Sequence, residues 1–154
     1  MPEPSPVPKV CALLNRHGAQ YLLVGAQAAI LHGYVRDTHD VDILIPEDLA
    51  NHARVIAALA ELEDHAAAEL TPQDFIENVV VKIADEVEVD VSTRAWKVTF
   101  AEAAPTARRV LIEGVEIPFV ALPILIASKE TYRDQDQVDV QRLRTLLARQ
   151  RGAG

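Results

Sequence analysis

Two aspartates at the start of a short apolar segment constrain this chain more than any other feature. Asp40 and Asp42 flank Val41, and the apolar run 41–45 stops at Pro46. A run of this length and composition predicts a buried β-strand, and residues i and i+2 of a strand point to the same face. Because an unpaired charge beside a buried strand is costly, such a pair usually holds a cation. The sequence therefore predicts a cation site on one face of a sheet.

A glycine turn precedes the aspartate pair. Residues 21–24 predict a short strand, Gly25 follows directly, and the small residues of 26–31 predict a helix that ends at Gly33. Backbone N–H groups at the start of a helix can donate hydrogen bonds to a phosphate, aided by the helix dipole. The alternative is that Gly25 only permits close packing. A strand, a glycine turn, a helix and a paired-aspartate strand together form a layout for holding a metal-bound phosphate.

The rest of the chain predicts an α/β (α+β) fold. Strands separated by helices, together with antiparallel hairpins, imply a mixed β-sheet with helices packed on it. The expected helices begin at residue 7, at Pro46 and at residues 71–72, and two more cover 123–132 and 135–150; the expected hairpins join 78–84 to 86–92 and 109–112 to 115–121.

Length, charge and cysteine content exclude several classes of protein. The 154 residues fit one domain over 1–154, with 1–8 expected to be flexible and C-terminal helices over 123–150. The formal net charge of −8 argues against a large basic surface for nucleic acid. The chain has no apolar run of the roughly 20 residues that span a bilayer and no signal-like N-terminus. With Cys11 as the single cysteine, a cytoplasmic protein without a membrane partner is expected.

A later strand supplies the third acid of the predicted site. Asp90 lies between Val89 and Val91, in the way that Asp42 lies in its own strand, and Glu88 on the same face is its competitor. Magnesium prefers oxygen ligands and retains water, so carboxylates and phosphate oxygens can complete its coordination shell. We expect Mg²⁺, with Mn²⁺ as the alternative metal, at Asp40, Asp42 and Asp90. The competing interpretation is that alternating acids line a solvated face of the sheet.

Several other side chains are candidates for contact with a substrate. Arg36 could clamp a phosphate through two hydrogen bonds, and Lys129 could approach one as a point charge; either could instead be a surface cation. Thr38 could contact the substrate or cap the loop. Trp96 and Phe100 are expected in the core, with a base-stacking wall as the alternative.

Taken together, these residues resemble the nucleotidyltransferase superfamily of the DNA polymerase β type. Its pattern is an apolar strand, a Gly-Gly or Gly-Ser turn, a short helix, an apolar-flanked acid pair and a third Asp on a later strand. The likeness is greater to the small bacterial branch of stand-alone enzymes and toxin–antitoxin nucleotidyltransferases. The matching residues here are Val24-Gly25-Ala26, His32-Gly33, Arg36-Asp37-Thr38-His39-Asp40, Val41-Asp42, Asp90, Lys129 and Arg133-Asp134.

The resemblance implies an enzyme that moves a nucleoside monophosphate from a nucleoside triphosphate such as ATP to a hydroxyl group and releases pyrophosphate. The acceptor stays open among RNA, protein and small molecules. Ala26 departs from the pattern, because the family usually has Gly or Ser there. The alternative is therefore a weak or inactive module that binds a nucleotide or a protein, as a toxin–antitoxin or regulatory component; a phosphohydrolase is a third interpretation. A second copy of the chain or an antitoxin-like chain is the expected partner. The implied nucleotide contacts are Gly25, Ala26, Arg36, Thr38 and Lys129, and the implied catalytic and metal residues are Asp40, Asp42 and Asp90.

Overall fold

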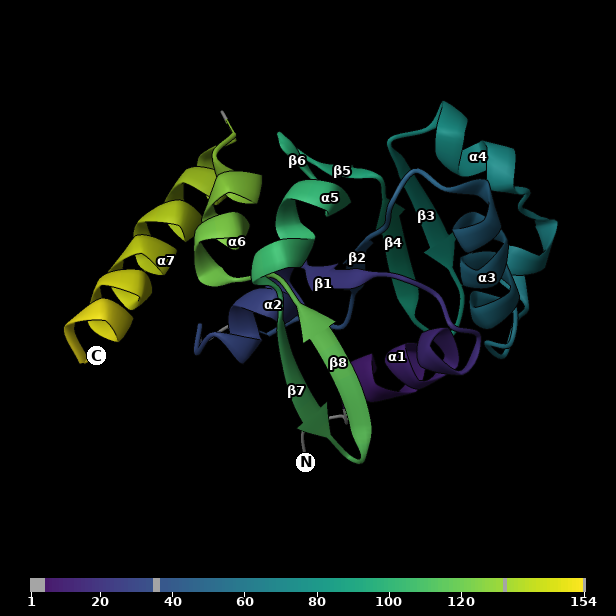
Figure 1. Ribbon diagram of the computed structural model, residues 1–154, viewed down its shortest axis with the longest axis horizontal. Coiled ribbons are helices and arrows are strands. Elements are labelled where there is room, and N and C mark those ends of the chain that lie inside the picture. Colours follow the sequence, from purple (N-terminus) through teal and green to yellow (C-terminus); the bar gives the residue numbers. More distant parts are fainter. Residues whose placement is uncertain (1–4, 35–36, 132, 154) are drawn as a thin grey trace.

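Six strands form one mixed sheet in the computed structural model, which describes residues 5–34, 37–131 and 133–153 (Figure 1). The strands are β1 (Leu22–Val24), β2 (Val41–Leu44), β3 (Val80–Ala84), β4 (Glu88–Ser92), β7 (Arg108–Ile112) and β8 (Val115–Phe119). Their order across the sheet is β3-β4-β2-β1-β8-β7. The predicted mixed sheet is therefore confirmed, with β3 and β7 at its edges.

The pairing of the strands combines local hairpins with long-range parallel contacts. The hairpins β3/β4 and β7/β8 are antiparallel, as the sequence predicts, and β1 is antiparallel to β2. In contrast, β2 pairs with β4 in parallel, and so does β1 with β8. The parallel pair β2/β4 brings the acid-bearing strands side by side in the middle of the sheet.

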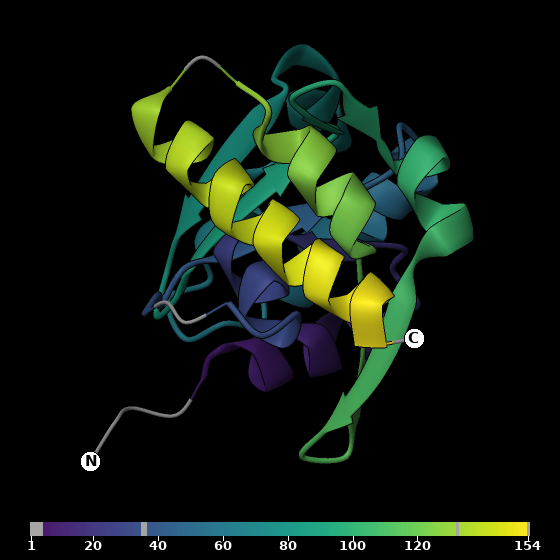
Figure 2. The ribbon, with the colours of Figure 1, turned by 90° about the vertical axis from the view of Figure 1, so that its left-hand side faces the viewer.

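Helices cover the sheet and end the chain. Helix α1 contacts α3 and β8, α2 contacts β1, β2 and α6, and α6 lies against α7 (Figures 1 and 2). In the described part of the chain, no helix combines the length and the apolar character needed to cross a membrane. The helices are α1 (Val7–Arg16), α2 (Gly25–Leu31), α3 (Leu49–Leu59), α4 (Pro72–Glu77), α5 (Phe100–Ala103), α6 (Leu122–Lys129) and α7 (Asp134–Ala153), with 3₁₀ turns η1 (Ala66–Glu69) and η2 (Ala104–Thr106).

Two boundaries differ from the expectations. Pro46 does not begin α3; instead the side chain of Asp48 accepts a hydrogen bond from the Asn51 N–H at 3.1 Å and caps the helix. At the N-terminus, Val7 and Pro8 already belong to α1, and both are buried. Helical structure thus begins inside the segment 1–8.

A second, two-stranded sheet was not predicted. Strands β5 (Arg94–Ala95) and β6 (Val98–Thr99) are antiparallel and are joined by Trp96 and Lys97. Helix α5 follows at once, and its first turn is closed by a capping box between Thr99 and Glu102. This small hairpin continues directly from β4, so it stays close to the acid-bearing strands.

The core lies around the central strands. Val41, Ile43, Val89 and Val91 have no exposed surface, so the alternate residues of β2 and β4 must point to the opposite face. Cys11 is buried in the same apolar cluster and has a free thiol. Because the apolar residues fix which face each strand buries, they also fix where the carboxylates point.

Candidate functional site

Asp42 and Asp90 lie directly opposite each other on neighbouring strands. The parallel pairing of β2 with β4 matches Asp42 with Asp90, and the antiparallel pairing of β1 with β2 matches Val24 with Asp42. The two predicted acids are far apart in the sequence, but the register of the sheet brings their side chains together.

The pair is arranged like a site that needs a positive charge. Burial raises the pKa of Asp42 to about 7, with further increases from the carboxylates of Asp90 and Asp40, while Lys129 opposes the shift. The Oδ1 atom of Asp90 is buried and has no hydrogen-bond partner among the described residues. Buried acceptor oxygens are normally satisfied, and a hard divalent cation binds such oxygens. The donor set therefore fits Mg²⁺ or Mn²⁺.

The other two acids lie at the margin of the pair. Asp40 precedes β2 and is exposed. Burial, and then contact with Asp40, raise the pKa of Glu88, whose carboxylate also lies 3.9 Å from the Lys82 Nζ. Glu88 thus interacts with Asp40, whereas Asp90 is the acid that lies opposite Asp42. Within the described ranges, no group of three His, Cys, Asp or Glu side chains could hold a metal by itself, so oxygens from water or a phosphate would have to complete the shell.

Gly25 is required by the position of Asp42. Its φ angle is +66°, and a Cβ atom added there would lie 2.3 Å from Asp42 Oδ2. Any side chain would therefore collide with the carboxylate and would also occupy a backbone region that favours glycine. Helix α2, which Gly25 begins, has only 7 residues, so its dipole alone makes a weak anion site. The close approach of Asp42 therefore explains why a glycine is needed at this position, which the sequence alone did not show.

A cleft of about 600 Å³ collects most of the predicted residues. It lies between the carboxylate face of the sheet, the β5–β6 hairpin and the beginning of α7. Glu88 is not among its lining residues, and Arg36 falls outside the part of the chain that the structure describes. The predicted residues that line the cleft are Gly25, Ala26, Thr38, Asp40, Asp42, Asp90 and Lys129.

Two of these residues are held by local hydrogen bonds. The Asp40 N–H donates to Thr38 Oγ1 at 3.4 Å, so Thr38 stabilises the loop before β2. The buried amide of Gln27 donates to the carbonyl oxygens of Thr38 and Asp40 at 3.3 and 3.2 Å. This amide therefore ties α2 to the loop that carries the first acid.

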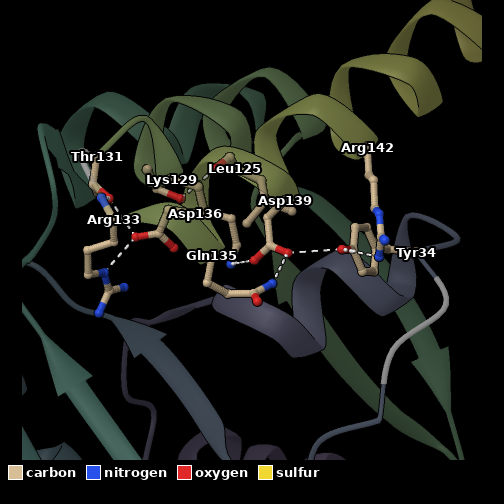
Figure 3. A network of polar contacts seen from close by, with 10 residues as sticks. Tyr34, Leu125, Lys129, Thr131, Arg133, Gln135, Asp136, Asp139 and Arg142 are labelled. Carbon is tan, nitrogen blue, oxygen red and sulfur yellow. Dashed lines mark hydrogen bonds and ion pairs between the residues drawn. The ribbon is translucent and has the colours of Figure 1, made fainter.

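Lys129 is fixed in the wall of the cleft by a partner from α7. Its Nζ donates to Asp139 Oδ2 at 2.9 Å, and the two side chains are only 12% and 2% exposed. The other oxygen, Oδ1, accepts from the Tyr34 hydroxyl and the Gln135 amide, both at 2.9 Å (Figure 3). Although burial alone would raise the pKa of Asp139, the hydrogen bond and charge of Lys129 hold it below its usual value. Lys129 is therefore a positioned cation and not a mobile surface charge.

A second acid of α7 anchors the segment that precedes the helix. Asp136 Oδ2 accepts from Arg133 Nε at 2.8 Å and from Thr131 Oγ1 at 2.6 Å (Figure 3). Arg133, Asp136 and Asp139 all line the cleft. The sequence analysis did not single out Asp139. The one available signal was the spacing of Asp136 and Asp139 on a helix, which puts both on one face.

The expected core position of Trp96 is wrong. The residue is 41% exposed and lines the cleft. Phe100, by contrast, is half-buried against the core cluster.

Comparison with known proteins supports the fold. No protein-family model matches the chain, and no curated protein matches it. A crystal structure from Thermotoga maritima, of a protein named a "putative nucleotidyltransferase", matches with a TM-score of 0.50 and 14% sequence identity, over 96% of this chain and 89% of that one. At this level of identity the match shows a shared fold. The predicted nucleotidyltransferase-like fold is thus confirmed.

Proposed function

We propose that this protein is a Mg²⁺-dependent nucleotidyltransferase, which moves a nucleoside monophosphate from a nucleoside triphosphate to a hydroxyl group and releases pyrophosphate. One observation carries the proposal. Asp42 and Asp90 lie opposite each other on β2 and β4, and a buried oxygen of Asp90 has no partner among the described residues. A pair of carboxylates in this state needs a cation, and the cleft beside it has room for a nucleotide.

In the proposed reaction Asp42 and Asp90 would hold the metal, and Asp40, at the margin of the cleft, would add negative charge beside them. When bound, Mg²⁺ neutralises phosphate charge and favours displacement at phosphorus. The acceptor oxygen forms a bond to the α-phosphorus, the bond to pyrophosphate breaks, and Asp90 accepts the hydroxyl proton as the general base. The roles of the two central acids therefore differ, although their positions in the sheet are equivalent.

The phosphates would be bound by groups that surround the acid pair. Gly25, Ala26 and Thr38 line the same cleft, and Lys129 adds a positive charge whose position Asp139 fixes. Arg36 keeps its proposed role as a phosphate clamp. Since Ala26 has no hydroxyl group, the terminal phosphates depend on backbone donors at this turn.

The proposal is tested by nucleotide binding and pyrophosphate release. Calorimetric titration of the wild-type protein with each nucleoside triphosphate should show binding that requires Mg²⁺. Asp42→Asn should lower the affinity for the nucleotide at least tenfold, because it removes one of the two charges that hold the metal. Asp64→Asn is the matched control, since Asp64 is an exposed acid that does not line the cleft. Unchanged binding in Asp42→Asn would refute the proposal.

Ala26 supports a second candidate function. A module that binds a nucleotide or a protein partner without catalysis would need the same fold and cleft but no serine at the turn. It would act as a toxin–antitoxin or regulatory component, alone or with a second copy of the chain. Metal-dependent nucleotide binding without pyrophosphate release, for RNA, protein and small-molecule acceptors alike, would favour this function. Either function suits the cytoplasm, where the free thiol of Cys11 stays reduced.

A further inference from the structure

The turn between β5 and β6 places a large side chain where glycine is usual. Trp96 and Lys97 are the two central residues of this turn, and Trp96 has a φ angle of +57°. Lys97 is not among the described residues with positive φ. A positive φ at only the first central residue is the pattern of a type II′ hairpin turn, where glycine is favoured. A tryptophan there is strained, and strain of this kind gathers at ligand-binding positions.

The position of Trp96 in the cleft gives a use for this strained turn. Trp96 lines the 600 Å³ cleft that contains Asp42 and Asp90. It also lines an adjoining hollow of about 280 Å³, together with Ser128, Thr131 and Arg133. Trp96 and Arg133 border both spaces, so they stand at the junction between the carboxylate site and the hollow. A planar group attached to a metal-bound phosphate could enter the hollow at this point.

We propose that Trp96 stacks on the nucleobase of the donor nucleoside triphosphate. This inference rests on the proposed function and names the part of the site that receives the base. Indole faces bind the π-face of any base, so stacking adds affinity with little base selectivity. Arg133 forms the neighbouring wall, oriented by its bond to Asp136 Oδ2 at 2.8 Å, and a guanidinium plane can also stack on a base. The proposed ligand thus places its metal-bound phosphates at the acids and its flat aromatic base at the turn.

Fluorescence tests the contact directly, because Trp96 is the only tryptophan in the chain. Mg²⁺–ATP should change the intensity of the tryptophan emission of the wild-type protein. Mg²⁺–tripolyphosphate is the matched probe, since it carries the phosphates without a base, and it should bind and leave the emission nearly unchanged.

Substitution separates the base contact from folding. Trp96→Gly suits the backbone of the turn, so its melting temperature should equal or exceed that of the wild type. Its affinity for Mg²⁺–ATP should fall by roughly 5- to 150-fold, the range expected for the loss of one stacked base. Its affinity for Mg²⁺–tripolyphosphate should not change. Trp96→Phe keeps an aromatic face and should recover most of the affinity for ATP.

Three outcomes would overturn the inference. If Trp96→Gly binds Mg²⁺–ATP as tightly as the wild type, while Asp42→Asn abolishes that binding, the proposed function stands and the stacking role of Trp96 fails. If the variant binds ATP normally but loses affinity for a single-stranded RNA, the indole contacts the acceptor and not the donor. Absence of Mg²⁺–ATP binding in the wild type would instead remove the proposed function, and this inference with it.

Discussion

Asp42 is a residue whose environment opposes its own charge. Burial and the carboxylates of Asp90 and Asp40 raise its pKa from 3.8 to about 7. A raised carboxyl pKa means that the folded state holds the proton more tightly than the unfolded state. The contribution of Asp42 to the stability of the folded state is therefore complete below pH 3.8, and it is lost as the pH rises through about 7. Without a metal, the ionised pair should destabilise the protein at alkaline pH.

Asp42→Asn should consequently stabilise the metal-free protein while it removes metal binding. At pH 8 with a chelator, we expect a gain of about 1–2 kcal/mol, or a rise in Tm of roughly 2–8 °C for a chain of this size. The difference should shrink toward pH 4, where Asp42 is protonated in the wild type. Thermal unfolding followed by circular dichroism measures both values. A lower Tm for the variant at pH 8 would contradict the repulsion between these carboxylates.

Gly25 should tolerate no side chain, and Gly18 provides the control. Both have φ near +66° (+66° and +67°), but an added Cβ would lie 2.3 Å from Asp42 Oδ2 at Gly25 and would meet nothing within 4 Å at Gly18. Gly18→Ala should cost about 1 kcal/mol for its left-handed backbone alone. Gly25→Ala should cost about 1–3 kcal/mol more, because Asp42 or the turn must move, and nucleotide binding should be lost. If chemical denaturation shows the same loss of unfolding free energy for both variants, the contact with Asp42 does not affect stability.

The sequence indicated that Gly25 and Asp42 belong to one site but not that they touch. Their closeness depends on the antiparallel register of β1 and β2, which local patterns do not state. The choice between Asp90 and Glu88 also depends on strand register. The flanking valines favoured Asp90, but only the pairing of β4 with β2 shows which acid faces Asp42.

At the scale of elements, strong local signals predicted well and long-range ones did not. The hairpins expected over 78–92 and 109–121 are confirmed as β3/β4 and β7/β8. The β5–β6 hairpin was not predicted, because its turn, Trp96–Lys97, contains no Gly, Asn or Pro. The start of α3 was misplaced because Pro46 resembled a first-turn proline, although the cap is Asp48. Asp139 was missed because no spacing rule links a helix near the C-terminus to an earlier sheet.

The packing of α6 against α7 should depend on the buried pair of Lys129 and Asp139. Lys129→Met should cost roughly 3–5 kcal/mol, since it removes the positive charge that lies 2.9 Å from the buried carboxylate of Asp139. Adding Asp139→Asn should recover part of that loss, and a double-mutant cycle by urea unfolding measures the coupling. Independent, additive effects of the two substitutions would contradict a direct interaction.

The same pair makes a prediction about acid pH. The pKa of Asp139 lies below 3.8 in the folded state, so its stabilisation is present above pH 3.8 and is lost as the pH falls through the folded value. The stability difference between the wild type and Lys129→Met should therefore be full at pH 7 and should shrink below pH 3.8. A difference that stays constant down to pH 2 would show that the charge of Asp139 does not stabilise the fold.

At the scale of the whole molecule, the cleft is assembled from segments that lie far apart in the chain. Its lining runs from Val24 at the end of β1 to Asp139 in α7, and both the central sheet and the two C-terminal helices contribute. The chain carries a net charge of −8, and the paired acids add local repulsion to this general excess. A divalent cation in the cleft would offset charge where the fold concentrates it. The proposed cation site thereby links the sheet topology to the proposed transfer reaction.

The most direct test of the account is the binding of Mn²⁺, measured by electron paramagnetic resonance in the presence of a non-hydrolysable ATP analogue. The wild-type protein and the exposed control Asp64→Asn should each hold Mn²⁺ in a protein-bound form, and Asp42→Asn and Asp90→Asn should each lose it. Undiminished binding of Mn²⁺ by Asp42→Asn and Asp90→Asn would place the metal elsewhere and contradict the account.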